Sequence, residues 1–148
     1  MSCINRRVYL DAEHRFTLKE EPVPQPRDDE VLVKIVANGI CGSDLNFFNE
    51  GRLGNFVVTK PYVPGHEASG IIEAVGSKVQ GISLGDHVVI EPGIPCGRCH
   101  YCRIGRYNLC EEVVFLSAPP INGTFCDYVS VRWDSVHVIP NEMHFEHG

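Results

Sequence analysis

Residues 65–79 read GHEASGIIEAVGSKV and are the most informative part of the sequence for the expected fold. It places a short run of small and β-branched apolar residues between glycines, which is typical of a strand. Two residues that can bind a metal, His66 and Glu67, stand at its beginning. The stretch therefore predicts a strand that carries a candidate metal site at its start.

Similar short β-rich runs recur on both sides of this stretch. In residues 28–40 Val31, Val33 and Ile35 alternate with their neighbours, as in a strand. Further strands are expected within residues 6–24, 68–76, 85–93 and 123–140, and a short helix within residues 41–51. Ten prolines and fourteen glycines between these runs favour an all-β barrel or sandwich with long loops. No long amphipathic helix is visible, which argues against a parallel α/β sheet.

Composition narrows the class of protein. A chain of 148 residues has the size of one domain, and 43% hydrophobic with 22% charged residues is typical of a globular protein. A net charge of -6 disfavours a nucleic acid or an anionic membrane as partner. The first residues have no apolar core of a signal peptide, and no stretch approaches membrane-spanning length. We therefore expect a cytoplasmic protein, in which clustered cysteines are more often metal ligands than disulfides.

Four of the seven cysteines lie in PCGRCHYCRIGRYNLC, residues 95–110. Three are spaced C-x2-C-x2-C, and the fourth follows after seven residues. Thiolates in this spacing fill the tetrahedral sphere of zinc, so Cys96, Cys99, Cys102 and Cys110 predict a structural zinc site with no open position. An iron–sulfur cluster, disulfides and inert thiols are the alternatives, and the spacing disfavours the first of them. His100 could compete as a ligand, but four thiolates suffice, which favours an exposed histidine.

A second candidate metal site combines Cys41, in GICGSD, with His66, in GHE, which begins 24 residues after Cys41. A catalytic zinc takes three protein ligands and keeps one position open for water or substrate, and these two residues supply two ligands. The alternative is a buried free cysteine and a core histidine, which is the commoner situation for single residues. The pair alone does not decide between the two interpretations.

The surrounding sequence resembles the zinc-dependent medium-chain alcohol dehydrogenase family. Residues 65–79 match its GHE-x2-G-x5-G-x2-V pattern in full, and residues 39–70 look most like its sorbitol (polyol) dehydrogenase branch. The resemblance runs from about Arg7 to the end of the chain. It implies a mainly β fold: a GroES-like, partly open β-barrel with short helices and a zinc-binding loop lobe at about residues 91–111. Residues 1–148 would be the catalytic domain, and a Rossmann cofactor domain would follow residue 148.

The resemblance also implies roles for single residues. Cys41 and His66 would ligate a catalytic zinc, with Glu67 beside it as a ligand or as a supporting group. Ser43 is the candidate for the first step of a proton relay, and Asp44 is expected to accept a hydrogen bond from the non-ligating nitrogen of His66. The alternative for Ser43 and Asp44 is helix N-capping. The four clustered cysteines would hold the structural zinc.

The implied activity is that of an NAD- or NADP-dependent dehydrogenase acting on a polyol or secondary alcohol. The catalytic zinc would polarise the alcohol oxygen for hydride transfer to nicotinamide. Threonine or butanediol dehydrogenase of the same family is one alternative, and a non-catalytic zinc-stabilised β module is another. The whole protein is expected to be a homodimer or homotetramer, and these 148 residues alone are expected to be inactive because they contain no nucleotide-binding glycine motif.

Some aromatic side chains have two possible roles, and two cysteines have no role in the expected sites. Four phenylalanines are candidates either for an apolar substrate channel or for the core: Phe47, Phe48, Phe56 and Phe115. Cys3 and Cys126 are expected to be ordinary thiols.

Overall fold

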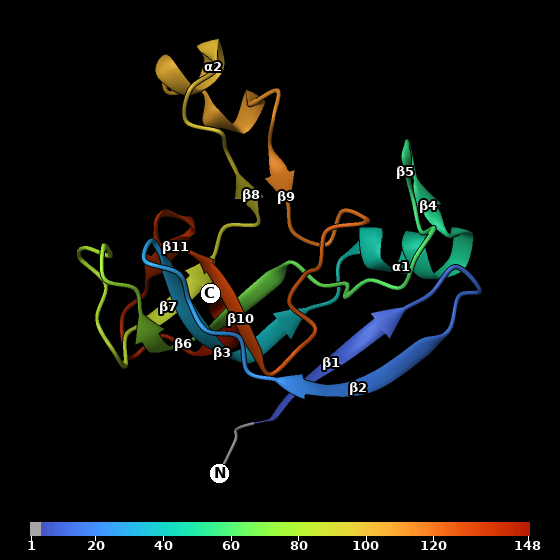
Figure 1. Ribbon diagram of the computed structural model, residues 1–148, viewed down its shortest axis with the longest axis horizontal. Helices are drawn as coiled ribbons and strands as arrows, with labels where there is room; N and C mark the ends of the chain where they lie inside the picture. Colours follow the sequence, from blue (N-terminus) through green and yellow to red (C-terminus); the bar gives the residue numbers. More distant parts are fainter. Residues whose placement is uncertain (1–3) are drawn as a thin grey trace.

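The computed structural model describes residues 4–148, which are mainly β (Figure 1). The strands are β1 (Ile4–Leu10), β2 (Phe16–Pro22), β3 (Glu30–Gly39), β4 (Arg52–Leu53), β5 (Phe56–Val57), β6 (Glu67–Val75), β7 (His87–Ile90), β8 (Gly93–Ile94), β9 (Val114–Phe115), β10 (Tyr128–Arg132) and β11 (Val136–Val138). The helices are α1 (Gly42–Glu50) and α2 (His100–Arg103), with 3-10 turns η1 (Tyr107–Leu109), η2 (Trp133–Ser135) and η3 (Phe145–His147). Within residues 4–148 no helix is long and apolar enough to cross a membrane.

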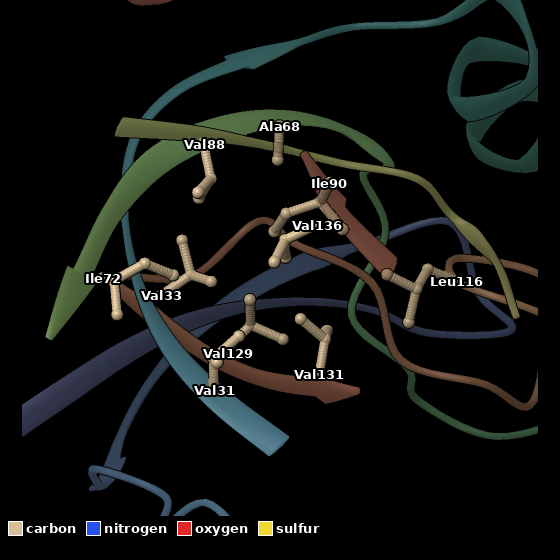
Figure 2. Packing of buried hydrophobic residues seen from close by; sticks show 10 residues of the cluster. All are labelled: Val31, Val33, Ala68, Ile72, Val88, Ile90, Leu116, Val129, Val131 and Val136. Atoms are coloured by element: carbon tan, nitrogen blue, oxygen red, sulfur yellow. The ribbon is translucent and has the colours of Figure 1, made fainter. Parts of the chain in front are cut away.

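The central sheet has five antiparallel strands in the order β10-β3-β6-β7-β11. It curves around one apolar cluster to which every one of its strands contributes (Figure 2). The edge strands β10 and β11 are joined by η2 and do not pair with each other, so the barrel stays partly open. The mainly β fold expected from the sequence is confirmed.

The pairing of β3 with β6 is the centre of this sheet. Val31 and Val33 on β3 are fully buried, as the alternation in the sequence predicted, and Ile72 on β6 is 1% exposed. Leu32, on the other face of β3, is also buried. Burial of each such side chain stabilises the fold by about 1.5–3 kcal/mol. Gly70 is required by this pairing, because a Cβ there would lie 2.2 Å from the carbonyl oxygen of Lys34. This glycine, inside the predicted strand, thus lets the two backbones approach.

The hairpin of β1 and β2 is attached to the sheet through a side-chain amide that pairs with the backbone of β10 as a neighbouring strand would. Asn5 is 1% exposed. Its amide nitrogen donates to the backbone carbonyl of Tyr128 at 2.9 Å, and its amide oxygen accepts from the backbone N–H of Tyr128 at 2.9 Å. Val8 adds a backbone hydrogen bond to the Phe125 carbonyl. The hairpin was expected as one or two strands, and its point of attachment was not predicted.

Residues between β8 and β9 form a lobe that projects away from the barrel (Figure 1). The two strands share only two residue pairs, Gly93 with Phe115 and Ile94 with Val114. Beyond them the chain makes only the short turns α2 and η1 before it returns. This ribbon and the ribbon of β4 and β5 were not expected from the sequence, because two-residue strands leave no detectable periodicity.

Candidate metal centres

The mixed cluster of Cys41, His66 and Glu67 is assembled by the pairing of β3 with β6. The last residue of β3, Gly39, lies opposite the first residue of β6, Glu67. Cys41 follows β3 by two residues and His66 immediately precedes β6, so the antiparallel register brings them to the same end of the sheet. One possible ligand atom from each of the three residues lies within 4.8 Å of the others. The structure therefore brings together the residues that the sequence singled out.

Asp44 fixes both segments that carry this cluster. It is 5% exposed in the first turn of α1. One carboxylate oxygen accepts from the backbone N–H of Cys41 at 3.0 Å. The other accepts from the backbone N–H of Gly65 at 3.2 Å and from the hydroxyl of Ser117 at 3.3 Å. Asp44 thus caps the helix and also ties the loop of Cys41 to the loop of His66.

The expected hydrogen bond between His66 and Asp44 is not formed. His66 Nδ1 lies 4.0 Å from Asp44 Oδ1, which is too far for a hydrogen bond. The reason is that the carboxylate is already occupied by nearer donors, two backbone N–H groups and a hydroxyl. Nδ1 is buried and has no hydrogen-bond partner among the described residues. Asp44 therefore lies near His66, but the predicted hydrogen bond between them is wrong.

Glu67 differs from the other two cluster residues because its side chain is exposed. It lines a pocket of about 300 Å³ together with Ser69 and Phe145. A Cβ on Gly39 would lie 2.3 Å from a carboxylate oxygen of Glu67, so the glycine leaves the space that this carboxylate occupies. Ser43 is half-buried and makes no side-chain hydrogen bond within residues 4–148. Its part in a proton relay stays a prediction.

The donor set of the mixed cluster fits zinc. One thiol, one imidazole and one carboxylate are the ligand types that zinc takes in catalytic sites. A buried imidazole nitrogen without a hydrogen-bond partner is costly, and a cation bound at that nitrogen would satisfy it. The cluster supplies at most three ligands, which leaves one position of a tetrahedron open.

The four-cysteine cluster fits a closed zinc site. The sulfur atoms of Cys96, Cys99, Cys102 and Cys110 lie within 4.8 Å of one another, and Cys99 and Cys102 are 3.5 Å apart. Sulfurs at about 2.3 Å from a tetrahedral zinc would be separated by nearly this distance. No disulfide joins cysteines within residues 4–148, and His100 is exposed and outside the cluster, as predicted.

The backbone around these sulfurs is arranged to support thiolates. The N–H of Cys96 donates to the sulfur of Cys110 at 3.3 Å, and the N–H of Cys99 donates to the sulfur of Cys96 at 3.4 Å. A backbone hydrogen bond from Cys102 lowers the pKa of the Cys99 thiol to about 6. Burial raises the pKa of Cys102 to about 12. Without a cation the four sulfurs cannot all be ionised at neutral pH, whereas a dication would stabilise them as thiolates.

The phenylalanines divide between the core and the mixed cluster. The ring of Phe115, on β9, meets the ring of His66 edge-on with centroids 5.7 Å apart. Phe47 is buried in a small core with Tyr62, and its ring is 6.0 Å from that of Tyr62. Phe48 stacks on Phe16, and Phe56 is exposed on β5. Of these four rings, Phe115 is the one that packs against the ring of a cluster residue.

Two cysteines remain, Cys126 and Cys3, and of these the structure describes Cys126, which lies outside both clusters. Cys126 donates to the backbone carbonyl of Tyr128, and burial raises the pKa of its thiol to about 11. These features agree with the ordinary thiol that the sequence led us to expect. Cys3 lies outside the described residues.

Comparison with known proteins agrees with this architecture. The family model of the alcohol dehydrogenase GroES-like domain matches residues 27–141. The chain is 52% identical over 125 residues to sorbitol dehydrogenase of Bacillus subtilis, covering 84% of this chain and 35% of that protein. It is 43% identical over 143 residues to D-xylulose reductase A of Aspergillus oryzae, covering 96% of this chain and 40% of that protein.

A solved structure extends the similarity to three dimensions. It is described as a short chain alcohol dehydrogenase of Escherichia coli CFT073 complexed with NADH, with a TM-score of 0.86 and 29% identity, covering 99% of this chain and 41% of that one. The chain thus spans about two fifths of the length of such relatives. The GroES-like fold implied by residues 65–79 is confirmed, and the chain belongs to the family of the alcohol dehydrogenase GroES-like domain.

Proposed function

We propose that this chain is the zinc-binding catalytic domain of an NAD- or NADP-dependent polyol or secondary-alcohol dehydrogenase. The observation that carries the proposal is the convergence of Cys41, His66 and Glu67 at one end of the β3–β6 pair. Sorbitol dehydrogenase and D-xylulose reductase among the relatives favour a polyol and its ketose as the substrate pair. No described feature favours threonine or butanediol, or a role without catalysis.

The residues of the mixed cluster have distinct tasks in this proposal. Cys41 and His66 would hold zinc, and Glu67 would complete the set or exchange with a ligand, since its carboxylate is exposed. When bound, the metal supplies Lewis-acid polarisation of the alcohol oxygen. Asp44 holds the Cys41 and Gly65 backbones at fixed positions, which orients the ligands before substrate arrives. Ser43, two residues from Cys41, would pass the alcohol proton toward solvent.

The second cluster has a structural task. We assign zinc to Cys96, Cys99, Cys102 and Cys110, because their four sulfurs leave no position for a substrate. Nicotinamide would bind to a Rossmann domain after residue 148, as the longer relatives suggest. The same resemblance supports a homodimer or homotetramer. The need for reduced thiols in both clusters favours the cytoplasm.

Metal content and activity test this function together. The purified protein should contain up to two zinc ions per chain, and Cys41→Ser should reduce this by one. The full-length enzyme should oxidise sorbitol or xylitol with NAD or NADP, and residues 1–148 alone should not. Two findings would refute the proposal: absence of zinc after purification without chelators, or unchanged turnover in the full-length Cys41→Ser variant.

A further inference from the structure

The segment that returns from the cysteine lobe contacts the mixed cluster at one point and the supporting carboxylate of Asp44 at another. Phe115, on β9, packs edge-on against the His66 ring at a centroid distance of 5.7 Å. Two residues later, Ser117 donates its hydroxyl to Asp44 at 3.3 Å. Both contacts come from the segment directly after the lobe. One contact reaches His66 itself, and the other reaches the carboxylate that fixes the backbone of Cys41 and of Gly65.

Ser117 is held in an unusual conformation to make its contact. Its φ angle is +68°, in the left-handed region that non-glycine residues rarely adopt, and it is 3% exposed. Such a conformation costs of order 1 kcal/mol and persists only where the surroundings impose it. The hydroxyl of Ser117 and the carboxylate of Asp44 are both buried, so the conformation serves a polar contact beside the metal cluster.

The segment that carries these residues cannot set its own position. β8 and β9 share only two residue pairs, and so short a ribbon is not stable alone. On one side Leu116 enters the main core and donates a backbone hydrogen bond to Pro92. On the other side the ribbon leads to Cys96 and Cys110, which are joined by an N–H to sulfur hydrogen bond of 3.3 Å. The cysteine cluster therefore closes the open end of the ribbon.

The lobe has little else to hold it. Its apolar side chains are largely exposed, among them Ile104, Tyr107 and Leu109, which are 46–52% exposed. Neither apolar core of the described residues includes a residue between Pro95 and Phe115. A metal at the four sulfurs is the available source of order, and its loss would loosen β9.

We propose that Phe115 and Ser117 are positioning residues for the mixed cluster, and that metal binding in the cysteine lobe maintains metal affinity at Cys41, His66 and Glu67 through them. The lobe metal then supports the mixed cluster as well as ordering its own loop. This inference rests on the proposed function, because it takes both clusters as metal sites.

Zn²⁺ titrations of the full-length protein against a chromophoric chelator test the coupling. Phe115→Leu removes the aromatic edge. Ser117→Gly removes the hydroxyl and is suited to the left-handed backbone, so the fold is not penalised. Each should weaken Zn²⁺ binding at the mixed cluster by about tenfold, the usual effect of losing a supporting partner of a ligand, with the lobe metal retained. Phe115→Tyr keeps the ring edge and should restore the parent affinity.

Two further variants separate coupling from general damage. Val114→Ala alters the opposite face of the same strand and should leave both affinities unchanged. Cys99→Ser with Cys102→Ser empties the lobe and should weaken the mixed cluster as much as Phe115→Leu does, with no further loss when the changes are combined. Unchanged affinity at the mixed cluster in Phe115→Leu and Ser117→Gly would overturn the inference and leave the proposed function standing. A parent protein that binds no Zn²⁺ at Cys41, His66 and Glu67 would overturn both.

Discussion

The two candidate metal centres are built in opposite ways. The cysteine cluster draws its four ligands from fifteen consecutive residues, 96–110, in a lobe without an apolar core. The mixed cluster draws on the end of β3 and the start of β6, where the register of the central sheet sets the positions of the ligands. In the first centre the metal would organise the chain, and in the second the fold organises the ligands. The comparison separates a metal site that stabilises its own segment of the chain from a metal site whose ligands are positioned by the folded barrel.

Loss of the lobe metal should give the largest effect. Cys110→Ser is expected to raise protease cleavage within residues 96–110 by about tenfold or more, because local opening follows the loss of the contacts that order a segment. Cleavage elsewhere in the barrel should change far less. Limited proteolysis with mass spectrometry measures both regions in one sample. Cys126→Ser is the matched control, since that thiol lies outside the cluster. Equal protection of the lobe in the parent and Cys110→Ser would remove the distinction between the two centres.

Loss of Asp44 should destabilise the barrel end itself. Asp44→Ala leaves two backbone N–H groups and the Ser117 hydroxyl without their acceptor. Each buried donor left unpaired costs about 1–3 kcal/mol, so we expect a loss of about 3 kcal/mol or more in the free energy of unfolding. Asp44→Asn keeps one acceptor oxygen and should cost less. Denaturant unfolding measures both variants, and an Asp44→Ala protein as stable as the parent would contradict the role assigned to this carboxylate.

Gly39 offers a finer test of how the fold places a ligand. In Gly39→Ala the new methyl group would meet the carboxylate of Glu67 at 2.3 Å, so the side chain must turn away. We expect metal affinity at the mixed cluster to fall by about tenfold, with little loss of stability. Gly42→Ala is the control, because a Cβ there meets nothing within 4 Å. Isothermal titration with Zn²⁺ distinguishes them, and equal affinities would show that Glu67 is not a ligand.

The contrast between the centres also explains what the sequence could predict. The cysteine spacing is local, so the four ligands could be identified from residues alone. Cys41 and His66 could be joined only through the resemblance, because their meeting depends on the register of β3 against β6. That register includes two irregularities, between Leu32 and Val33 and between Ile35 and Ala37, which strand periodicity does not reveal. Phe115 and Ser117 reach the cluster through a ribbon of two residue pairs that has no sequence signature.

The strands were predictable because small and β-branched residues dominate β3 and β6, although in each strand three consecutive residues are buried. The hydrogen bond expected between His66 and Asp44 was wrong for a different reason: the competing donors come from Gly65 and Ser117, and the latter lies 73 residues from Asp44. The local donor, the backbone N–H of Cys41, corresponds to the helix N-capping that the sequence allowed, whereas the sequence indicates neither of the other two donors. Chemical identity and local capping could therefore be predicted at this site, and long-range hydrogen-bond partners could not.

The smallest effect on stability should come from the loss of a single polar contact on the barrel surface, and the pH dependence of thermal unfolding measures it. Hydrogen bonds from Arg6 hold the pKa of Asp127 below its usual 3.8. A carboxylate with a lowered pKa stabilises the fold above the unfolded-state pKa, and this stabilisation is lost as the pH falls through the folded-state pKa. Asp127→Asn should lower the thermal midpoint at pH 7 by about 2 °C or less, since exposed ion pairs contribute little.

The lobe should respond to acid over a different range. Protons compete with a metal for thiolates, so acidification from pH 7 toward about pH 4 should release the lobe metal while Asp127 remains ionised. Thermal unfolding and metal release followed over the same pH series compare the two regions directly. If the barrel loses stability at the pH at which the lobe loses its metal, also in Asp127→Asn, the barrel depends on the lobe metal. A barrel that keeps its midpoint after metal release would confine that dependence to β9 and the residues it touches.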